Sequence, residues 1–144
     1  MIGTWEGEGT GRWDAGEPFG YRETITLSHN GKPFLLYLQR TSAVDDGRPL
    51  HTESGYWRAA ADGTVELVLA HGIGVAEVET GRWEGSRLTL RSVWLGVAPT
   101  AKPVTALERV FDLRGDELDY TLRMATDGGD PSWHLGATLR RTAG

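Results

Sequence analysis

The chain has 144 residues, a length that suits one domain with a sizeable core. It has no cysteine and a formal net charge of −5. The absence of cysteine excludes disulfide scaffolds and thiolate-ligated metals, and it suits a reducing compartment. The acidic balance argues against nonspecific nucleic-acid binding, which needs a basic surface. No apolar run approaches the ~20 residues that would cross a bilayer, so we expect no membrane partner.

The opening stretch, Gly3 to Trp13, alternates with a period of two, as an extended strand does. One face carries Trp5 and Trp13 with glycines between them, including Gly7 and Gly9, and the other face is polar. Glycine on an inward face leaves nothing to pack. Two interpretations stay open: the glycines border a slot for a flat ligand or another backbone, or they relieve curvature in a strongly bent barrel strand.

The same stretch bears on localisation. Glu6 and Glu8 stand where a secretory signal would need its apolar core, so we expect no export and a cytoplasmic location.

Short alternating runs with turn residues between them continue to the end of the chain, and no window has a sustained helical period. Asp62-Gly63 is a strong hairpin signal, Thr80-Gly81 is expected to close a hairpin unit, and Gly96 to Pro99 is expected to break a strand. The strands predicted after the first are Tyr21–Ser28, Phe34–Thr41, Leu50–Arg58, Val65–His71, Gly74–Glu79, Ser86–Trp94, Lys102–Leu113, Leu118–Ala125 and Trp133–Thr142.

About ten antiparallel strands in residues 1–144 predict a single all-β domain, a closed or nearly closed up-and-down β-barrel, because closure removes exposed sheet edges. A β-sandwich is the alternative architecture. A barrel of this strand number has more interior than its side chains fill, so we expect a ligand cavity. Closure also places the opening strand near the last strand, where His134 lies.

Four histidines are the imidazole groups available for chemistry. His134 opens the last predicted strand on a face shared with Arg140, and it is either a metal ligand at the barrel mouth or a structural group. His71 continues an apolar face and either lines a pocket or is a hydrogen-bonded core histidine. His51 begins a strand on a face shared with Glu53. His29 lies in a polar turn, and the chain has no His-x-His or His-x-x-x-His spacing that would predict a structural zinc site.

Lys102 lies where a strand is expected to begin, and it is either a partner for an acidic ligand group at the barrel rim or an ordinary solvated charge. No Gly-x-Ser-x-Gly nucleophile elbow is present, so a hydrolase has little support.

Several segments resemble the nitrobindins, a family of haem-binding β-barrels shaped like lipocalins and fatty-acid-binding proteins. Gly3 to Gly9 is similar to the family's G-x-W-x-G-x-G signature. The other similar segments, in the family's order, are His29–Phe34, Pro49–Tyr56, Glu66–His71, Pro99–Lys102 and His134–Leu139. The chain departs from the family at Trp13-Asp14-Ala15, where the family usually has Tyr-Pro-Thr.

The resemblance implies a haem b cofactor whose ferric iron is held by His134, with Lys102 beside the haem. It also implies that Trp5, Gly7, Gly9, His51 and His71 lie at the cofactor pocket. The implied chemistry is nitric oxide binding and isomerisation of peroxynitrite to nitrate, which would make the protein a peroxynitrite isomerase that handles reactive nitrogen species. An axial imidazole leaves the sixth iron position open to such ligands.

Two alternatives remain. The first is a non-catalytic carrier of a hydrophobic small molecule such as a fatty acid, with Arg140 or Lys102 holding its carboxylate. The second is a barrel whose interior is filled by tryptophans, such as Trp13, Trp94 and Trp133, with no small ligand. The sequence leaves the oligomeric state open.

Overall fold

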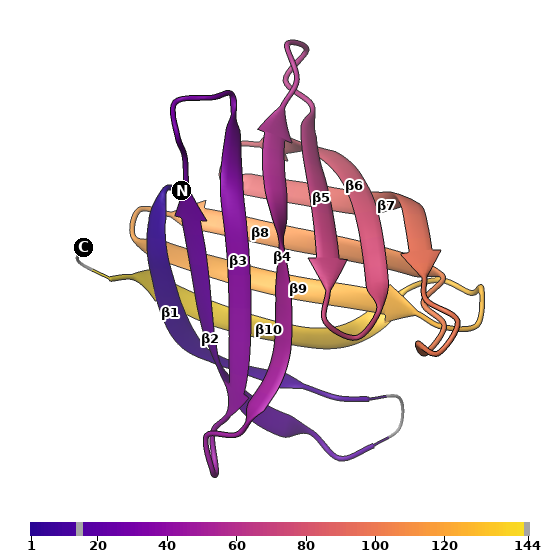
Figure 1. The fold of residues 1–144 in the computed structure, drawn as a ribbon. Coiled ribbons are helices and arrows are strands. Elements are labelled where there is room, and N and C mark those ends of the chain that lie inside the picture. The colour runs from indigo at the N-terminus through magenta and orange to yellow at the C-terminus, as the bar shows by residue number, and fades with distance from the viewer. Residues whose placement is uncertain (14–15, 143–144) are drawn as a thin grey trace.

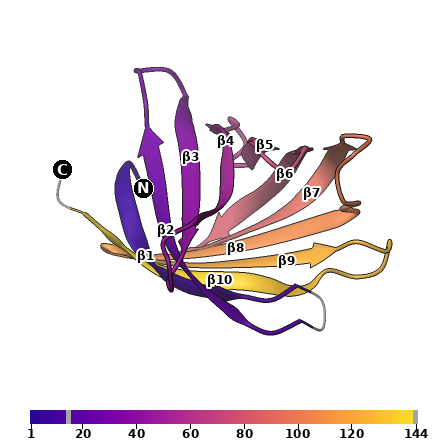
Figure 2. The same ribbon diagram turned by 60° about the horizontal axis from the view of Figure 1, so that its bottom comes forward.

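A computed structural model describes residues 1–13 and 16–142, and it confirms the closed antiparallel β-barrel. In Figure 1, strands β2 to β5 cross in front of β8 to β10, and Figure 2 shows the strands curving around one interior. The strands are β1 (Gly3–Gly11), β2 (Phe19–Ser28), β3 (Phe34–Ala43), β4 (Pro49–Ala59), β5 (Val65–His71), β6 (Val75–Glu84), β7 (Arg87–Val97), β8 (Ala106–Arg114), β9 (Glu117–Ala125) and β10 (Ser132–Arg141).

Each strand pairs with its sequence neighbour, and β1 closes the barrel by pairing with β10. The expectation that the opening strand lies beside the strand of His134 is therefore confirmed. Within the described part of the chain, no helix has the length and apolar character needed to span a membrane.

The period-two alternation fills one end of the barrel with apolar side chains, because every second residue of each strand points inward. The rings of Trp57 and Tyr120 lie on either side of Phe111, each with its centroid 4.9 Å from the Phe111 centroid. We call this end the apolar floor; its fully buried members are Trp5, Ile25, Leu27, Leu67, Leu88, Leu90, Phe111, Leu118 and Leu139.

Glycine misled the prediction of strand ends in the middle of the chain. Thr80-Gly81 does not close a hairpin, because both residues lie inside β6, and the turn comes at Gly85, whose φ is 63°. A Cβ atom at Gly81 would overlap the carbonyl oxygen of Thr89 on the neighbouring strand. Gly96 likewise lies within β7, which ends one residue later at Val97, inside the stretch predicted to break it. Gly81 allows close strand contact instead of a turn, whereas a Cβ at Gly96 would meet the ring of Trp94.

The glycines of β1 have the same role, and the slot predicted beside them is absent. A Cβ at Gly7 would overlap the backbone at Thr138, and one at Gly9 would lie 2.5 Å from the Tyr21 ring. The backbone of the neighbouring strand and an aromatic ring fill the space. The part of the first interpretation that describes these two positions is therefore the close approach of another backbone, and not a slot for a flat ligand.

Candidate functional site

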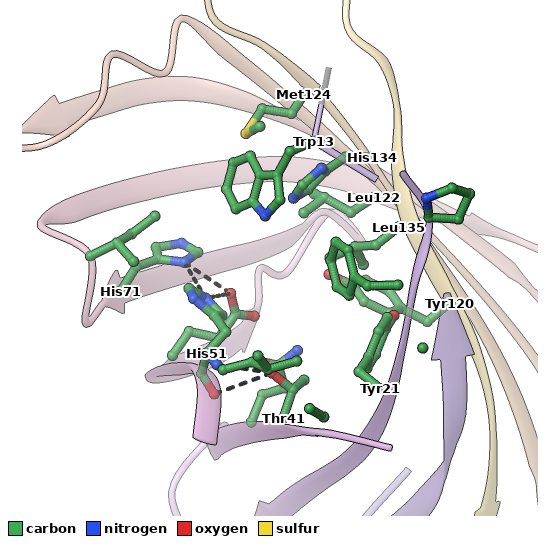
Figure 3. Close-up of a pocket in the computed structure, with 18 of the residues that line it drawn as sticks. Trp13, Tyr21, Thr41, His51, His71, Tyr120, Leu122, Met124, His134 and Leu135 are labelled. Carbon is green, nitrogen blue, oxygen red and sulfur yellow. Dashed lines mark hydrogen bonds and ion pairs between the residues drawn. The ribbon is translucent and has the colours of Figure 1, made fainter. Parts of the chain in front are cut away.

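A cavity of about 750 Å³ occupies the end of the barrel opposite the apolar floor. The predicted ligand cavity is thus present, and its size lies within the range of small-molecule sites. Its wall is mainly apolar, and Figure 3 shows the side chains that line it. The polar groups that reach the cavity include Tyr21, Gln39, Thr41, His51, Glu53, His71 and His134.

His134 reaches the cavity because of an irregularity in β10. The pairing of β10 with β9 shifts between Trp133 and Leu135, so His134 is the extra residue of a β-bulge. Consecutive residues of a regular strand point to opposite faces, yet His134 and Leu135 both line the cavity. The expected face shared with Arg140 is wrong for this reason: Arg140 points outward and forms an ion pair with Glu117, 2.7 Å between Nη2 and Oε2.

The protonation of the His134 ring is fixed by a backbone contact. Its Nδ1 lies 2.8 Å from the carbonyl oxygen of Arg12, which can only accept, so Nδ1 carries a hydrogen and donates it. In the neutral ring the lone pair is then on Nε2. A hydrogen bond that fixes the tautomer in this way is the usual arrangement behind a metal-binding histidine.

Trp13 covers His134 at the rim of the cavity. The two ring centroids are 4.5 Å apart, and the Trp13 indole also lines the cavity while staying 47% exposed. Lys102 places its Nζ 5.4 Å from the centroid of the same indole, close enough for a cation–π contact. Lys102 thus lies beside a cavity-lining ring, although it is not itself among the cavity-lining residues and β8 begins only at Ala106. Asp14 and Ala15, which complete the departure from the family pattern, lie outside the described residues.

The other two tryptophans that were considered as fillers of the barrel interior do not enter the cavity. Trp94 and Trp133 are 56% and 43% exposed, and neither lines the cavity. Trp5 is completely buried, and its Nε1 donates to the carbonyl of Met1. Like Gly7 and Gly9, Trp5 does not line the cavity, and the cofactor-binding role expected of these three residues stays a prediction.

His51 and His71 do line the cavity, and they meet each other and Glu53 on its wall. Glu53 in β4 pairs directly with His71 in β5, and His51 lies two residues before Glu53 on the same face. His51 Nε2 is 3.1 Å from His71 Nδ1, and the Glu53 carboxylate oxygen Oε2 is 3.0 Å from His71 Nδ1 (Figure 3).

A layer of buried polar groups includes part of this cluster and separates the cavity from the apolar floor. Its centre is Arg109, which is fully buried and contacts Glu53, Glu77 and Glu79 at 3.2, 2.6 and 2.7 Å. Beside it, Gln39 donates to Glu23. We call this layer the polar belt; its members are Glu23, Gln39, Glu53, His71, Glu77, Glu79 and Arg109.

The polar belt shifts the pKa values of its members in different directions. Burial would raise the pKa of Glu53, but Arg109 and the hydrogen bonds with His51 and His71 outweigh it and hold that pKa well below the usual range. Burial raises the pKa of Glu79 to about 8, with Arg109 opposing the shift. Burial also opposes the charge of His71, yet hydrogen bonds to two carboxylates raise its pKa to about 9.

Sequence reasoning found the histidines of this site but missed most of the polar belt. Arg109 and Glu77 lie inside strands, where a charged residue usually marks the solvent face, and neither was singled out. A signal was present, because Glu77 and Glu79 share their strand face with Val75. That pattern alone does not identify the inward face, since Ala76 and Val78 on the other face are also apolar.

Comparison with known proteins gives four concordant findings. A family model described as a THAP4-like, heme-binding beta-barrel domain matches residues 1–141. The protein named peroxynitrite isomerase 2 of Mycobacterium marinum is 50% identical over 145 residues, which cover 98% of this chain and 90% of the relative. The protein named peroxynitrite isomerase 1 of Mycobacterium tuberculosis is 45% identical over 148 residues, with the same coverage. The crystal structure of Rv2717c from M. tuberculosis matches with a TM-score of 0.91 at 45% identity, and the match covers 99% of this chain and 93% of that one.

Proposed function

Because the chain belongs to the family of THAP4-like, heme-binding β-barrel domains, we propose that its cavity holds haem b through His134 and that the haem-loaded protein isomerises peroxynitrite to nitrate. The observation that carries the proposal is the β-bulge, which turns His134 into an apolar cavity. The relatives named peroxynitrite isomerases support the assignment of the reaction.

The residues at the cavity fit a haem. The Arg12 carbonyl orients the His134 ring and sets its tautomer, so Nε2 is the atom that would bind iron. Apolar side chains such as Leu122, Met124 and Leu135 suit the faces of a porphyrin. When bound, the haem would supply a ferric iron able to bind a small ligand.

The rim residues have separate roles in this proposal. Lys102, whose Nζ lies over the Trp13 ring, would provide a cation for a haem propionate. Trp13 covers the His134 ring and restricts the access of water to it. His51 and His71, on the wall formed by β4 and β5, contribute polar groups to the space in which a small anion would react.

Peroxynitrite and nitrate contain the same atoms, so the proposed reaction needs no reductant or oxidant. The protein must admit a small anion to the cavity, hold it beside the iron and release the product. The mainly apolar wall would exclude water from the reacting groups while the anion is held.

The carrier alternative has lost its supporting feature. It relied on Arg140 sharing a face with His134, but Arg140 is on the outside of the barrel and paired with Glu117. Lys102 alone does not favour a fatty acid over a haem propionate, since both present a carboxylate.

Titration of the haem-free protein with hemin tests the proposal. We expect a Soret band that saturates at one hemin per chain, loss of that band's ligand response in His134→Ala, and no change in His29→Ala, which alters an exposed turn. Stopped-flow decay of peroxynitrite should then be faster with the loaded wild type, with nitrate as the product. An unaltered spectrum in His134→Ala would contradict the assignment of His134 as the residue that binds the haem iron.

A further inference from the structure

His51, Glu53 and His71 have the composition of a metal site, and the barrel places them together without help from a loop. Glu53 and His71 are directly opposed in the pairing of β4 with β5, and His51 precedes Glu53 by two residues. Paired strands hold their side chains more rigidly than loops do, which favours a preorganised site. Two imidazoles and one carboxylate form a donor set that binds divalent transition metals such as Zn²⁺ and Fe²⁺.

The three donor atoms converge on one point. His51 Nε2 and His71 Nδ1 are 3.1 Å apart, and Glu53 Oε2 lies 3.0 Å from the His71 atom and 3.5 Å from the His51 atom. Donors in a tetrahedral site with bonds of 2.0–2.2 Å are separated by about 3.3–3.6 Å. One edge of the observed triangle has this length and the other two are 0.2–0.3 Å shorter than its lower limit, so a small outward shift of the donors would admit an ion.

The groups behind the donors are those that a metal site requires. The second nitrogen of His71, Nε2, lies 2.7 Å from Oε1 of Glu77, so a carboxylate holds the hydrogen on Nε2. Metal binding then displaces the proton that Nδ1 shares with Glu53, which leaves the Nδ1 lone pair to bind the ion. Tyr37 donates to Oε1 of Glu53 over 2.9 Å, which fixes that carboxylate while Oε2 faces the histidines.

The site is open on one side only. Glu53 is buried, and the His71 side chain is 7% exposed, while the His51 side chain is 28% exposed toward the cavity. Three protein donors beside a cavity leave a coordination position for water or another small ligand, as in catalytic metal sites. Structural sites, by contrast, are closed by a fourth protein donor.

The charge of the surroundings suits a cation. Arg109 contacts Glu53 and disfavours a second positive charge, but Glu77 and Glu79 also surround that guanidinium. Glu53 and Glu77 stay ionised, and together they exceed the single charge of Arg109 by one, so groups already in place offset part of the charge of a divalent cation.

We propose that His51, Glu53 and His71 bind a divalent transition-metal ion on the wall of the cavity that faces His134. In the closed order of ten strands, β5 is five strands from β10 in both directions, so the two walls oppose each other across the barrel. Figure 3 likewise places His51 and His71 away from His134, with the Trp13 indole between them. A metal here and an iron on His134 would therefore border the same cavity, on opposite sides of the Trp13 indole.

Titration of the haem-free, tag-free protein with Co²⁺ tests the site without reliance on the proposed haem function. We expect one Co²⁺ per chain, visible ligand-field bands, and their loss on addition of Zn²⁺. His51→Ala should weaken binding by more than about 100-fold, and Glu77→Gln by about 10–100-fold, because Glu77 only orients a donor. The matched control is His29→Ala, which should bind within twofold of the wild type.

Nitrogen NMR of the wild-type protein gives an independent readout that needs no variant to fold. Added Zn²⁺ should shift the resonances of His51 Nε2 and His71 Nδ1 and leave those of His29 in place. Absence of ligand-field bands, unweakened binding in His51→Ala with the same fold by circular dichroism, or a Zn²⁺ response at other histidines would each overturn the proposal. A failed hemin titration beside successful Co²⁺ binding would refute the haem proposal alone.

Discussion

The two ends of the barrel interior are built on opposite principles. The apolar floor is filled with large rings and aliphatic side chains, such as Trp5 and Phe111, and no solvent reaches it. The other end keeps a cavity of about 750 Å³ above the polar belt, where Arg109 binds three carboxylates. Close packing stabilises a fold but leaves no room for a ligand, so one end serves stability and the other serves binding.

This contrast predicts that the contribution of the polar belt to the free energy of unfolding depends on charge pairing, and that of the apolar floor on side-chain volume. Replacing Arg109 with Met should have the largest effect, because it leaves three buried carboxylates without their cation. We expect the free energy of unfolding to fall by about 3–5 kcal/mol in urea denaturation. The control is Arg140→Met, which removes an exposed ion pair and should cost less than about 1 kcal/mol. Equal losses in the two variants would show that the belt does not need its arginine.

A truncation in each region tests the role of volume. Phe111→Ala opens a cavity in the floor and should lower the free energy of unfolding by about 3–4 kcal/mol. Ile73→Ala removes a cavity-lining side chain that is already 49% exposed, and it should cost less than about 1 kcal/mol. Comparable losses would contradict the division of the interior into a packed and an open end.

The pH dependence of stability sharpens the comparison further, because the polar belt contains carboxyl groups that titrate and the named residues of the apolar floor do not titrate. Burial raises the pKa of Glu23 to about 7, although the hydrogen bond from Gln39 opposes the shift. The folded chain therefore holds this proton between about pH 4.5 and 7, where the unfolded chain has released it. Stability must fall as the pH rises through this window.

Glu23→Gln keeps the hydrogen-bond geometry but cannot titrate. Denaturation series at pH 4.5 and pH 7 should show that the variant loses about 1–3 kcal/mol less than the wild type across the window. The exposed control Glu6→Gln should follow the wild type. A variant that loses as much as the wild type would show that Glu23 does not hold its proton.

The smallest expected effect is kinetic and concerns the rim. Trp13→Ala removes the indole contacts with His134 and Lys102, so hemin should reach the histidine about fivefold faster in stopped-flow mixing, as expected for a contact of about 1 kcal/mol. Trp94→Ala, on a tryptophan that does not line the cavity, is the control. Slower association in Trp13→Ala would mean that the indole guides hemin in.

Much of the fold was predictable from short-range patterns. Alternation identified all ten strands, and β5 was predicted with its observed bounds, Val65–His71. The errors came at glycines such as Gly81, where the residue type is the same for a turn and for a close strand contact. Only the position of the neighbouring strand distinguishes a glycine in a turn from a glycine in a close strand contact, and the local sequence does not show that position.

The candidate site divides in the same way. His134, His51 and His71 were selected from the sequence because imidazole is scarce in this chain and the family resemblance marked their positions. The burial of Arg109 was not predictable, because a charged residue in an alternating strand is assigned to water unless its partners are known. Those partners come from β4 and β6, more than 25 residues away along the chain.

The sequence by itself predicted an all-β barrel in which His51, His71 and His134 each lie near one end of a strand, because the period of two is a local property of the residues. The tertiary structure decided where those groups point. A bulge turned His134 inward against the strand's own alternation, and strand register brought His71 opposite Glu53. Both depend on how neighbouring strands pair, and pairing is set by contacts that no local pattern contains.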